Sequence, residues 1–231
     1  MLLISTQAIA ETSGWQWQVT PWLWGAGMKG DVGAFRGVPA LHVDKSFDDI
    51  LKETRFSGFV EFSAQRDRFI VDTELMYIRT KEASSGNGEK LTLRTNQLIG
   101  TIAPGYRIAD DPSYSLDLLL GVRYWDINNS LSLHSAKVTG RYEEGISWWD
   151  GMAGLRGWFA LSERWSLLTK ADVGSGGSRK TWQLTGALTY QMTPDIAFST
   201  GWKTMSVDYQ RDSHTYDTTM SGPLFAVTWV F

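Results

Sequence analysis

Apolar and polar side chains alternate with a period of two residues along nearly the whole chain. In the clearest segment, Trp182, Leu184 and Leu188 fall on one face, and Gln183 and Thr185 fall on the other. Successive side chains of a strand point to opposite faces, whereas helical geometry would scatter these two sets around a cylinder. The sequence therefore predicts an all-β fold.

About ten such segments follow one another, and most have at least the ~9–11 residues that a tilted transmembrane strand requires. Bacterial single-chain barrels have an even number of strands, so that both ends of the chain lie on one side. We therefore expect an up-and-down antiparallel transmembrane β-barrel of about ten strands, with eight or twelve as alternatives. The expected strands are 15–31, 55–65, 69–79, 91–107, 114–126, 146–161, 165–174, 180–192, 195–209 and 218–231.

The connections between these segments alternate between tight and long. Tight turns are expected at 66–68, 110–112, 162–164 and 193–195. Longer polar connections are expected near 32–54, 80–90, 127–145, 175–179 and 210–217, with a short helical turn at 46–53. Outer-membrane barrels have short periplasmic turns and longer extracellular loops. The pattern predicts a bacterial outer-membrane location with periplasmic termini and extracellular long loops.

The composition fits this interpretation. The 231 residues include 12 Trp, 8 Tyr and 10 Phe, and Trp and Tyr are favoured where a membrane meets water. The longest apolar stretch is far below the ~18 residues of a transmembrane helix, so any membrane span must be made of strands. A net charge of -3 gives no electrostatic reason to expect a nucleic-acid partner. Without cysteine, disulfides and thiol chemistry are excluded.

The first residues are typical of the end of a secretory signal. Residues 1–9 are mostly apolar, and Ala8-Ile9-Ala10 fits a small-x-small cleavage site before Glu11. A disordered N-terminal tail is the alternative. In either case we assign 1–13 to this segment and 14–231 to a single barrel domain.

The last strand ends in an alternating apolar face formed by Phe225, Val227, Trp229 and Phe231. A terminal Phe behind such a face resembles the signal that the β-barrel assembly machinery of Gram-negative bacteria reads. We therefore expect this machinery as a partner during biogenesis and outer-membrane lipids as the partner of the finished barrel.

Several stretches together resemble a Gram-negative outer-membrane β-barrel protein family of uncharacterised function. The resemblance implies fold and location but no activity. Lys170 stands where the family is expected to have arginine, and the loop 174–179 departs from the usual form. The matching stretches are WQWQVTPWLWGAGMKGDV (15–32), VDKSFDDILKE (43–53), WWDGMAGLRGWFALSERWSLLTKADVG (148–174), TWQLTGALTYQM (181–192), GW and VDY within 201–209, and SGPLFAVTWVF (221–231).

Charged residues occupy the faces opposite to the aromatic ones and are therefore expected to line the barrel interior. Buried charges must be paired or remain hydrated, so we expect an ion-pair network that fills a narrow lumen. A hydrated pore whose charges set selectivity is the alternative. The expected network consists of Glu61, Asp72, Glu74, Asp117, Arg123, Asp150, Arg156, Lys170, Asp172 and Lys203, with Arg55 on the same wall.

Evidence for catalysis is weak in the sequence. His42, His134 and His214 all lie in expected loops without nearby carboxylates at metal-binding spacing, so we expect no metal and no cofactor. Asp212 and His214 are the best catalytic candidates, because omptin proteases use Asp and His at the extracellular rim to activate water. Our leading expectation is a non-enzymatic barrel with interacting surface loops, a largely plugged charged lumen and an unidentified extracellular ligand. The alternatives are a narrow passive pore and an omptin-like hydrolase.

Overall fold

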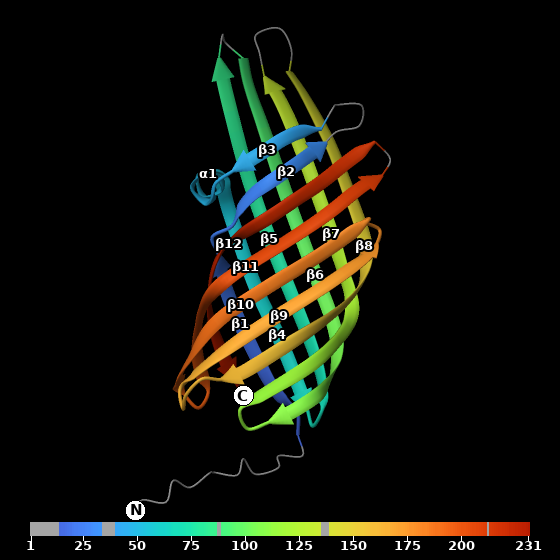
Figure 1. The fold of residues 1–231 in the computed structure, drawn as a ribbon. Helices are drawn as coiled ribbons and strands as arrows, with labels where there is room; N and C mark the ends of the chain where they lie inside the picture. Colours follow the sequence, from blue (N-terminus) through green and yellow to red (C-terminus); the bar gives the residue numbers. More distant parts are fainter. Residues whose placement is uncertain (1–13, 34–39, 87–88, 135–138, 212) are drawn as a thin grey trace, which may run out of the picture.

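The computed structural model describes residues 14–33, 40–86, 89–134, 139–211 and 213–231 (Figure 1). The expected signal segment 1–13 lies outside the described residues. Within them the chain forms twelve strands and one short helix. The elements are β1 (Gln16–Trp24), β2 (Gly27–Gly33), β3 (Leu41–Lys45), α1 (Phe47–Glu53), β4 (Thr54–Arg66), β5 (Phe69–Gly86), β6 (Glu89–Asp111), β7 (Tyr114–His134), β8 (Thr139–Ala160), β9 (Trp165–Gly176), β10 (Lys180–Thr193), β11 (Ile196–Arg211) and β12 (His214–Val230).

Ten of these strands close into an antiparallel barrel, which confirms the predicted fold class and strand number. From β4 to β12 each strand pairs with the next one in the chain, and β1 pairs with both β4 and β12. The closing seam runs from Gln18 opposite Val230 to Trp24 opposite Leu224. A closed barrel satisfies its backbone hydrogen bonds between strands, as a structure in lipid must.

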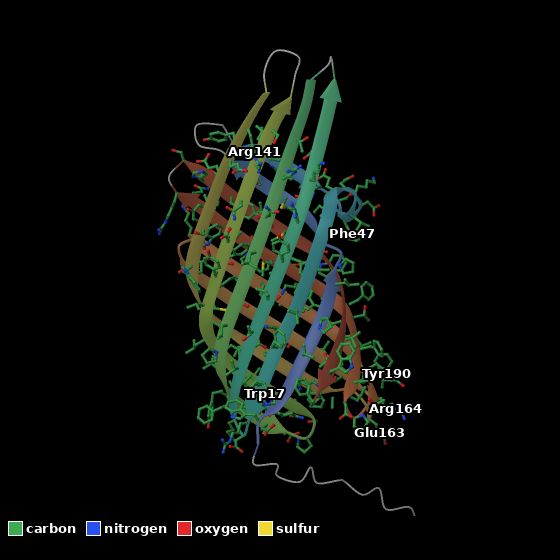
Figure 2. The ribbon with its side chains drawn as sticks, turned by 180° about the vertical axis from the view of Figure 1, so that it is seen from behind. Trp17, Phe47, Arg141, Glu163, Arg164 and Tyr190 are labelled. Atoms are coloured by element: carbon green, nitrogen blue, oxygen red, sulfur yellow. The ribbon has the colours of Figure 1, made fainter. Side chains whose placement is uncertain are left out.

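Tight turns gather at the end of the barrel where β1 begins and β12 ends (Figures 1 and 2). Asp67 takes a positive φ of 53° in the first turn. In the second turn the Asp111 carboxylate accepts hydrogen bonds from the hydroxyl and the amide of Ser113, which lower the pKa of Asp111. The four turns coincide with the tight connections that the sequence predicts.

An apolar belt covers the outside of the barrel. Leu118, Leu120 and Val122 alternate outward along β7 between Tyr114 near the turn and Tyr124, ten residues further on. At ~3.3 Å per residue and a tilt of about 40°, ten residues rise by about 25 Å, the height of the apolar band of outer-membrane barrels. Aromatic pairs mark both limits: Trp165 with Tyr190 near the turns, and Tyr124 with Trp149 at the other limit.

The structure corrects the prediction of long loops at 80–90 and 127–145. Strands β5 to β8 continue well beyond the apolar belt, to Gly86, from Glu89, to His134 and from Thr139. Exposed side chains of this extension, such as Arg94 and Asn128, are polar, so the apolar outward face that marks the other strands ends although the backbone pairing continues. The extension is therefore a projecting sheet rather than a set of loops (Figure 1).

The first expected strand, 15–31, also differs from the structure, because it divides into β1 and β2 at Gly25. The Gly25 amide donates to the Pro223 carbonyl, and a Cβ atom added at Gly222 would lie 2.0 Å from the Gly25 oxygen. This close crossing lets β2 continue along β12 while β3 pairs only with β2. The sequence analysis missed β3 and placed it in a loop.

Helix α1 follows the hairpin and confirms the expected helical turn at 46–53. Ser46 caps it: the Ser46 hydroxyl accepts from the Asp49 amide, and the Asp49 carboxylate accepts from the Ser46 amide. Hydrogen bonds from Ser46 lower the pKa of Asp49. In the described ranges, no helix has the length and hydrophobicity needed to cross a membrane.

Candidate functional site

The half of the lumen nearer the tight turns is crossed by a network of ion pairs. Five bases and five acids from β4 to β11 take part, and most of their side chains are buried. The bases are Arg107, Arg123, Arg156, Lys170 and Lys203, and the acids are Glu61, Asp72, Glu74, Asp117 and Asp172.

Arg156 and Lys170 hold the centre of this network. The Arg156 guanidinium contacts Asp72 Oδ2 and Asp117 Oδ2, both at 3.0 Å. Lys170 Nζ donates to the other Asp72 oxygen at 2.5 Å and to Glu61 Oε2 at 3.2 Å. Since Asp72 lies on β5 and Lys170 on β9, these bonds join walls that are distant around the barrel.

Two further pairs extend the network toward the middle of the barrel. Arg123, fully buried, donates from one terminal nitrogen to both Asp172 oxygens at 3.0 Å, and its Nε donates to Thr101 Oγ1. Lys203 pairs with Glu74 and lies 4.7 Å from the ring centroid of Trp22, a cation–π distance. Each buried charge in these pairs thus faces an opposite charge.

One member of the predicted set, Asp150, does not join an ion pair. Asp150 is buried in the lumen but accepts hydrogen bonds from the amide and hydroxyl of Ser178 and from Trp148 Nε1 instead of joining a base. It therefore fixes the turn between β9 and β10.

Arg107, which the sequence analysis did not select, contacts Asp117 at 2.9 Å. Its inward position on β6 was the signal that could have revealed it. The side chain of Arg55 lies outside the described residues.

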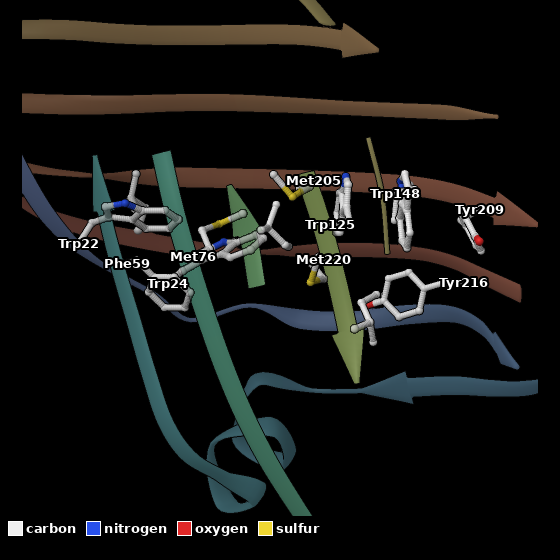
Figure 3. Close-up of a cluster of buried hydrophobic side chains, with 14 of the residues drawn as sticks. Trp22, Trp24, Phe59, Met76, Trp125, Trp148, Met205, Tyr209, Tyr216 and Met220 are labelled. Atoms are coloured by element: carbon white, nitrogen blue, oxygen red, sulfur yellow. The ribbon is translucent and has the colours of Figure 1, made fainter. Parts of the chain in front are cut away.

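Aromatic and methionine side chains form a layer above the ion pairs (Figure 3). The rings of Trp125 and Trp148 stack with centroids 5.5 Å apart, and Tyr209 stacks on Trp148 at 4.1 Å. On the other side of the layer Trp22 stacks on Phe59 at 4.7 Å. These aromatic residues fill the interior, whereas the sequence analysis associated aromatic faces mainly with lipid.

Two cavities lie on either side of this layer. The first, about 330 Å³, is a polar vestibule toward the tight turns, lined by residues such as Gln18, Ser63 and Thr228 together with members of the ion-pair network. The second, about 530 Å³, lies toward the sheet extension. Among the described residues, no residue lines both cavities.

A second seam, between β1 and β4, opens in the barrel wall beside the second cavity. Pairing between β1 and β4 ends at Trp22 opposite Phe59, and α1 lies between the diverging strands. Lys45 on β3 donates to Glu53 of α1 at 2.7 Å and to Glu82 of β5 at 3.0 Å, so it ties both sides of the seam together. Partial burial lowers the pKa of Lys45, but the two carboxylates raise it more, and its pKa lies above the ordinary value.

The histidines do not form a shared site in the structure. His214 is buried, and its Nε2 lies 2.8 Å from Glu144 of β8. His42 is exposed and pairs with Asp31 at 2.9 Å on the β2–β3 hairpin. The predicted partner Asp212 and the side chain of His134 lie outside the described residues. The sequence analysis missed the carboxylate of Glu144 because it is 70 residues away in the chain.

The C-terminal strand presents its apolar face outward. Phe225, Trp229 and Phe231 are exposed, and Val227 is partly exposed between them. Their alternation places them on the outer side of the seam at which β12 closes the barrel against β1.

Comparisons with known proteins bear on the fold. No protein-family model and no curated protein matches the sequence. The outer membrane protease OmpT from Escherichia coli is 10% identical, with a TM-score of 0.52 over 94% of this chain and 96% of that chain. The translocator domain of the autotransporter NalP from Neisseria meningitidis is 12% identical, with a TM-score of 0.49 over 94% of this chain and 88% of that chain. The likeness to OmpT, together with the closed ten-stranded sheet, shows that this chain has the fold of an outer-membrane β-barrel.

Proposed function

We propose that this protein is a non-enzymatic integral barrel of the bacterial outer membrane whose lumen is plugged by its own side chains. In this proposal the barrel serves to hold the projecting sheet of β5 to β8 and the β2–β3 hairpin outside the cell. The observation that carries it is the division of the lumen into two cavities that share no described lining residue.

The physical basis is the combined effect of the ion pairs and the aromatic layer. A hydrated ion loses its water shell in an apolar constriction, and hydrophobic constrictions close pores by excluding water. Arg123, Trp125 and Met205 are fully buried at this level. Paired charges in a small barrel fill the interior, whereas a conducting pore leaves its charges facing water.

Conductance in planar lipid bilayers tests the plug. The wild type should show little or no steady conductance. Trp148→Ala should raise it, because the stacked ring of Trp148 lies between Trp125 and Tyr209. Trp149→Ala is the matched control, since Trp149 points outward and is 59% exposed. Large, steady conductance of the wild type would favour the alternative of a narrow passive pore.

The proposal also includes the orientation of the barrel in the membrane and the surface used in its assembly. Short turns face the periplasm in outer-membrane barrels, which assigns both termini to the periplasm and α1 to the outer side. The outward face of Phe225, Val227, Trp229 and Phe231 would be the surface that the assembly machinery reads. The outer-membrane lipids would cover the apolar belt.

A hydrolase at the rim has less support. OmpT is a protease, but a likeness in fold at 10% identity does not by itself imply a shared chemistry. His214 contacts Glu144, and this pair links β12 to β8 across the lumen. A peptidase assay with purified protein tests the non-enzymatic assignment: turnover that disappears in His214→Asn would contradict it.

A further inference from the structure

The cavity on the extracellular side of the aromatic layer is built differently from the rest of the lumen. Its volume is about 530 Å³, which is within the range of ~300–1,000 Å³ for ligand pockets. Its floor is the aromatic layer itself, through Trp24, Phe59 and Met220. Strands β4 to β7 form one wall, and β2, β3 and β12 form the other.

The inner lining of this cavity is mainly apolar. Met28 and Val32 on β2 face Ile78 on β5 and Ile127 on β7. Polar side chains such as Thr95, Gln97 and Asn129 also reach the lining, so the apolar walls offer a surface for an apolar chain beside groups that can bind a neutral polar end. For scale, an engineered cavity of about 150 Å³ lined by aliphatic and aromatic side chains binds benzene. The present cavity is several times larger and has room for a guest of about ten to twenty carbon atoms by the same measure.

The side wall at the seam provides an entrance. Above the Trp22–Phe59 pair, β4 lacks β1 as a neighbour, and α1 covers the gap. Helix α1 contributes Phe47, Ile50 and Leu51 to the lining, yet it buries none of its residues fully. Phe47 is 40% and Leu51 57% exposed, so the apolar face of α1 lies partly against the cavity and partly open to the surroundings.

The charges at this entrance restrict the guest. Among the described residues, Lys45 and His42 are the bases that line the cavity. Lys45 is already shared between Glu53 and Glu82, and His42 pairs with Asp31. Asp44 also lines the cavity and pairs with Lys29. The lining therefore carries more acids than bases, which disfavours a carboxylate or phosphate group through like-charge repulsion.

We propose that this cavity is a binding site for an uncharged, slender apolar molecule, such as an alkyl chain with a neutral polar end, which enters at the seam beside α1. The apolar walls bind the chain, and the acidic entrance excludes anionic amphiphiles such as fatty acids. This site goes beyond the plugged, surface-presenting barrel, because it does not need the lumen to conduct.

Photo-crosslinking in lipid nanodiscs tests the proposal. The probe is a twelve-carbon alcohol that carries a diazirine, and the cross-linked peptides are identified by mass spectrometry. We expect cross-links on lumenal residues of β2, α1 and β5 that unlabelled dodecanol suppresses in a saturable manner. At pH 8, dodecanoate should compete about tenfold more weakly or worse, given the cost of bringing like charges together.

Cavity-filling variants supply the control. Ile78→Trp and Val32→Trp fill the site from opposite walls and should each reduce cross-linking several-fold, while Val173→Trp adds the same bulk to the lipid face and should leave it unchanged. Circular dichroism verifies that each variant is folded. Cross-links confined to outward-facing residues, or labelling that both filling variants leave unchanged, would overturn the site. Equal competition by dodecanol and dodecanoate would overturn the assignment of an uncharged guest.

Discussion

The two halves of the lumen are enclosed by the same sheet but are filled in opposite ways. Toward the tight turns, Arg156, Lys170 and Asp72 hold the walls together through charges. Toward the projecting sheet, the walls carry Met28, Ile78 and Ile127 and leave a cavity of about 530 Å³.

The difference between the two halves follows from how completely the strands of the barrel wall are paired. Where all ten strands pair, opposite walls are held at fixed distances that ion pairs can bridge with good geometry. Where β1 separates from β4, the wall depends on a seven-residue helix and a hairpin, and close packing across the interior is lost. The fully paired wall thus supports an interior of paired charges, whereas the separation of β1 from β4 leaves a cavity.

The largest difference between the two halves of the barrel is expected in the accessibility of inserted tags on intact cells. A peptide tag inserted between Gly86 and Glu89 should be labelled on intact cells, because the projecting sheet is extracellular in our proposal. A tag at Pro112 should be labelled only after the outer membrane is permeabilised. The reverse labelling pattern would mean that the tight turns face outward and the projecting sheet faces the periplasm.

Removal of one charge from the polar half should have the next largest effect. Arg123→Ala leaves Asp172 buried without its partner, and such a change typically costs ~3–5 kcal/mol. The exposed Arg141 pairs with Glu143 at the other end, and Arg141→Ala should change stability by less than about 0.5 kcal/mol. Urea titration of protein folded into vesicles measures both, and equal stabilities would mean that water reaches the ion pairs.

A charge on the lipid face should be slightly less costly. Leu188→Arg places a cation in the apolar belt, for which ~2–4 kcal/mol is expected near mid-membrane. Ser199→Arg is a suitable comparison, because Ser199 lies beside Thr189 in the register and faces the polar vestibule. Urea titration should show a clearly smaller loss for Ser199→Arg, and the opposite order would reverse the assignment of the faces.

The smallest effect is expected at α1 and is local. The pKa of Asp49 is lowered by Ser46, so the cap is fully present above the ordinary value of 3.8 and is lost as pH falls through the lowered value. Amide exchange in 47–53, corrected for its intrinsic pH dependence, should therefore increase between pH 5 and pH 2. Ser46→Ala should show fast exchange at both pH values, and a pH response that persists in this variant would exclude the cap as its cause.

Much of the barrel could be predicted from the sequence because a strand with one face in lipid must alternate. Leu184, Leu188 and Gln183 show this on β10, where both the strand and its two faces were predicted correctly. The four tight turns followed from Asp, Pro and Ser at the strand ends. The helical turn was predictable because Ser46 and Asp49 form its capping box.

The other features depend on contacts between distant parts of the chain. The division of the first strand at Gly25 arises from its crossing with Gly222 and Pro223, almost two hundred residues later. The continuation of β5 to β8 was assigned to loops because its exposed side chains, such as Arg94 and Asn128, are polar rather than apolar. The alternation placed Arg123 and Asp172 inward, but their pairing depends on the barrel's register and curvature, which no local pattern records.

The seam between the first and last strands has a consequence for the order of folding. Each pairing from β4 to β12 joins neighbours in the chain, whereas Thr20 must meet Thr228 across 208 residues. Closing such a large loop costs conformational entropy before any contact compensates for it, so the sheet is expected to grow hairpin by hairpin and to close last. Until β12 has paired with both β11 and β1, the sheet keeps open edges, and the unfinished sheet has no stable place in lipid.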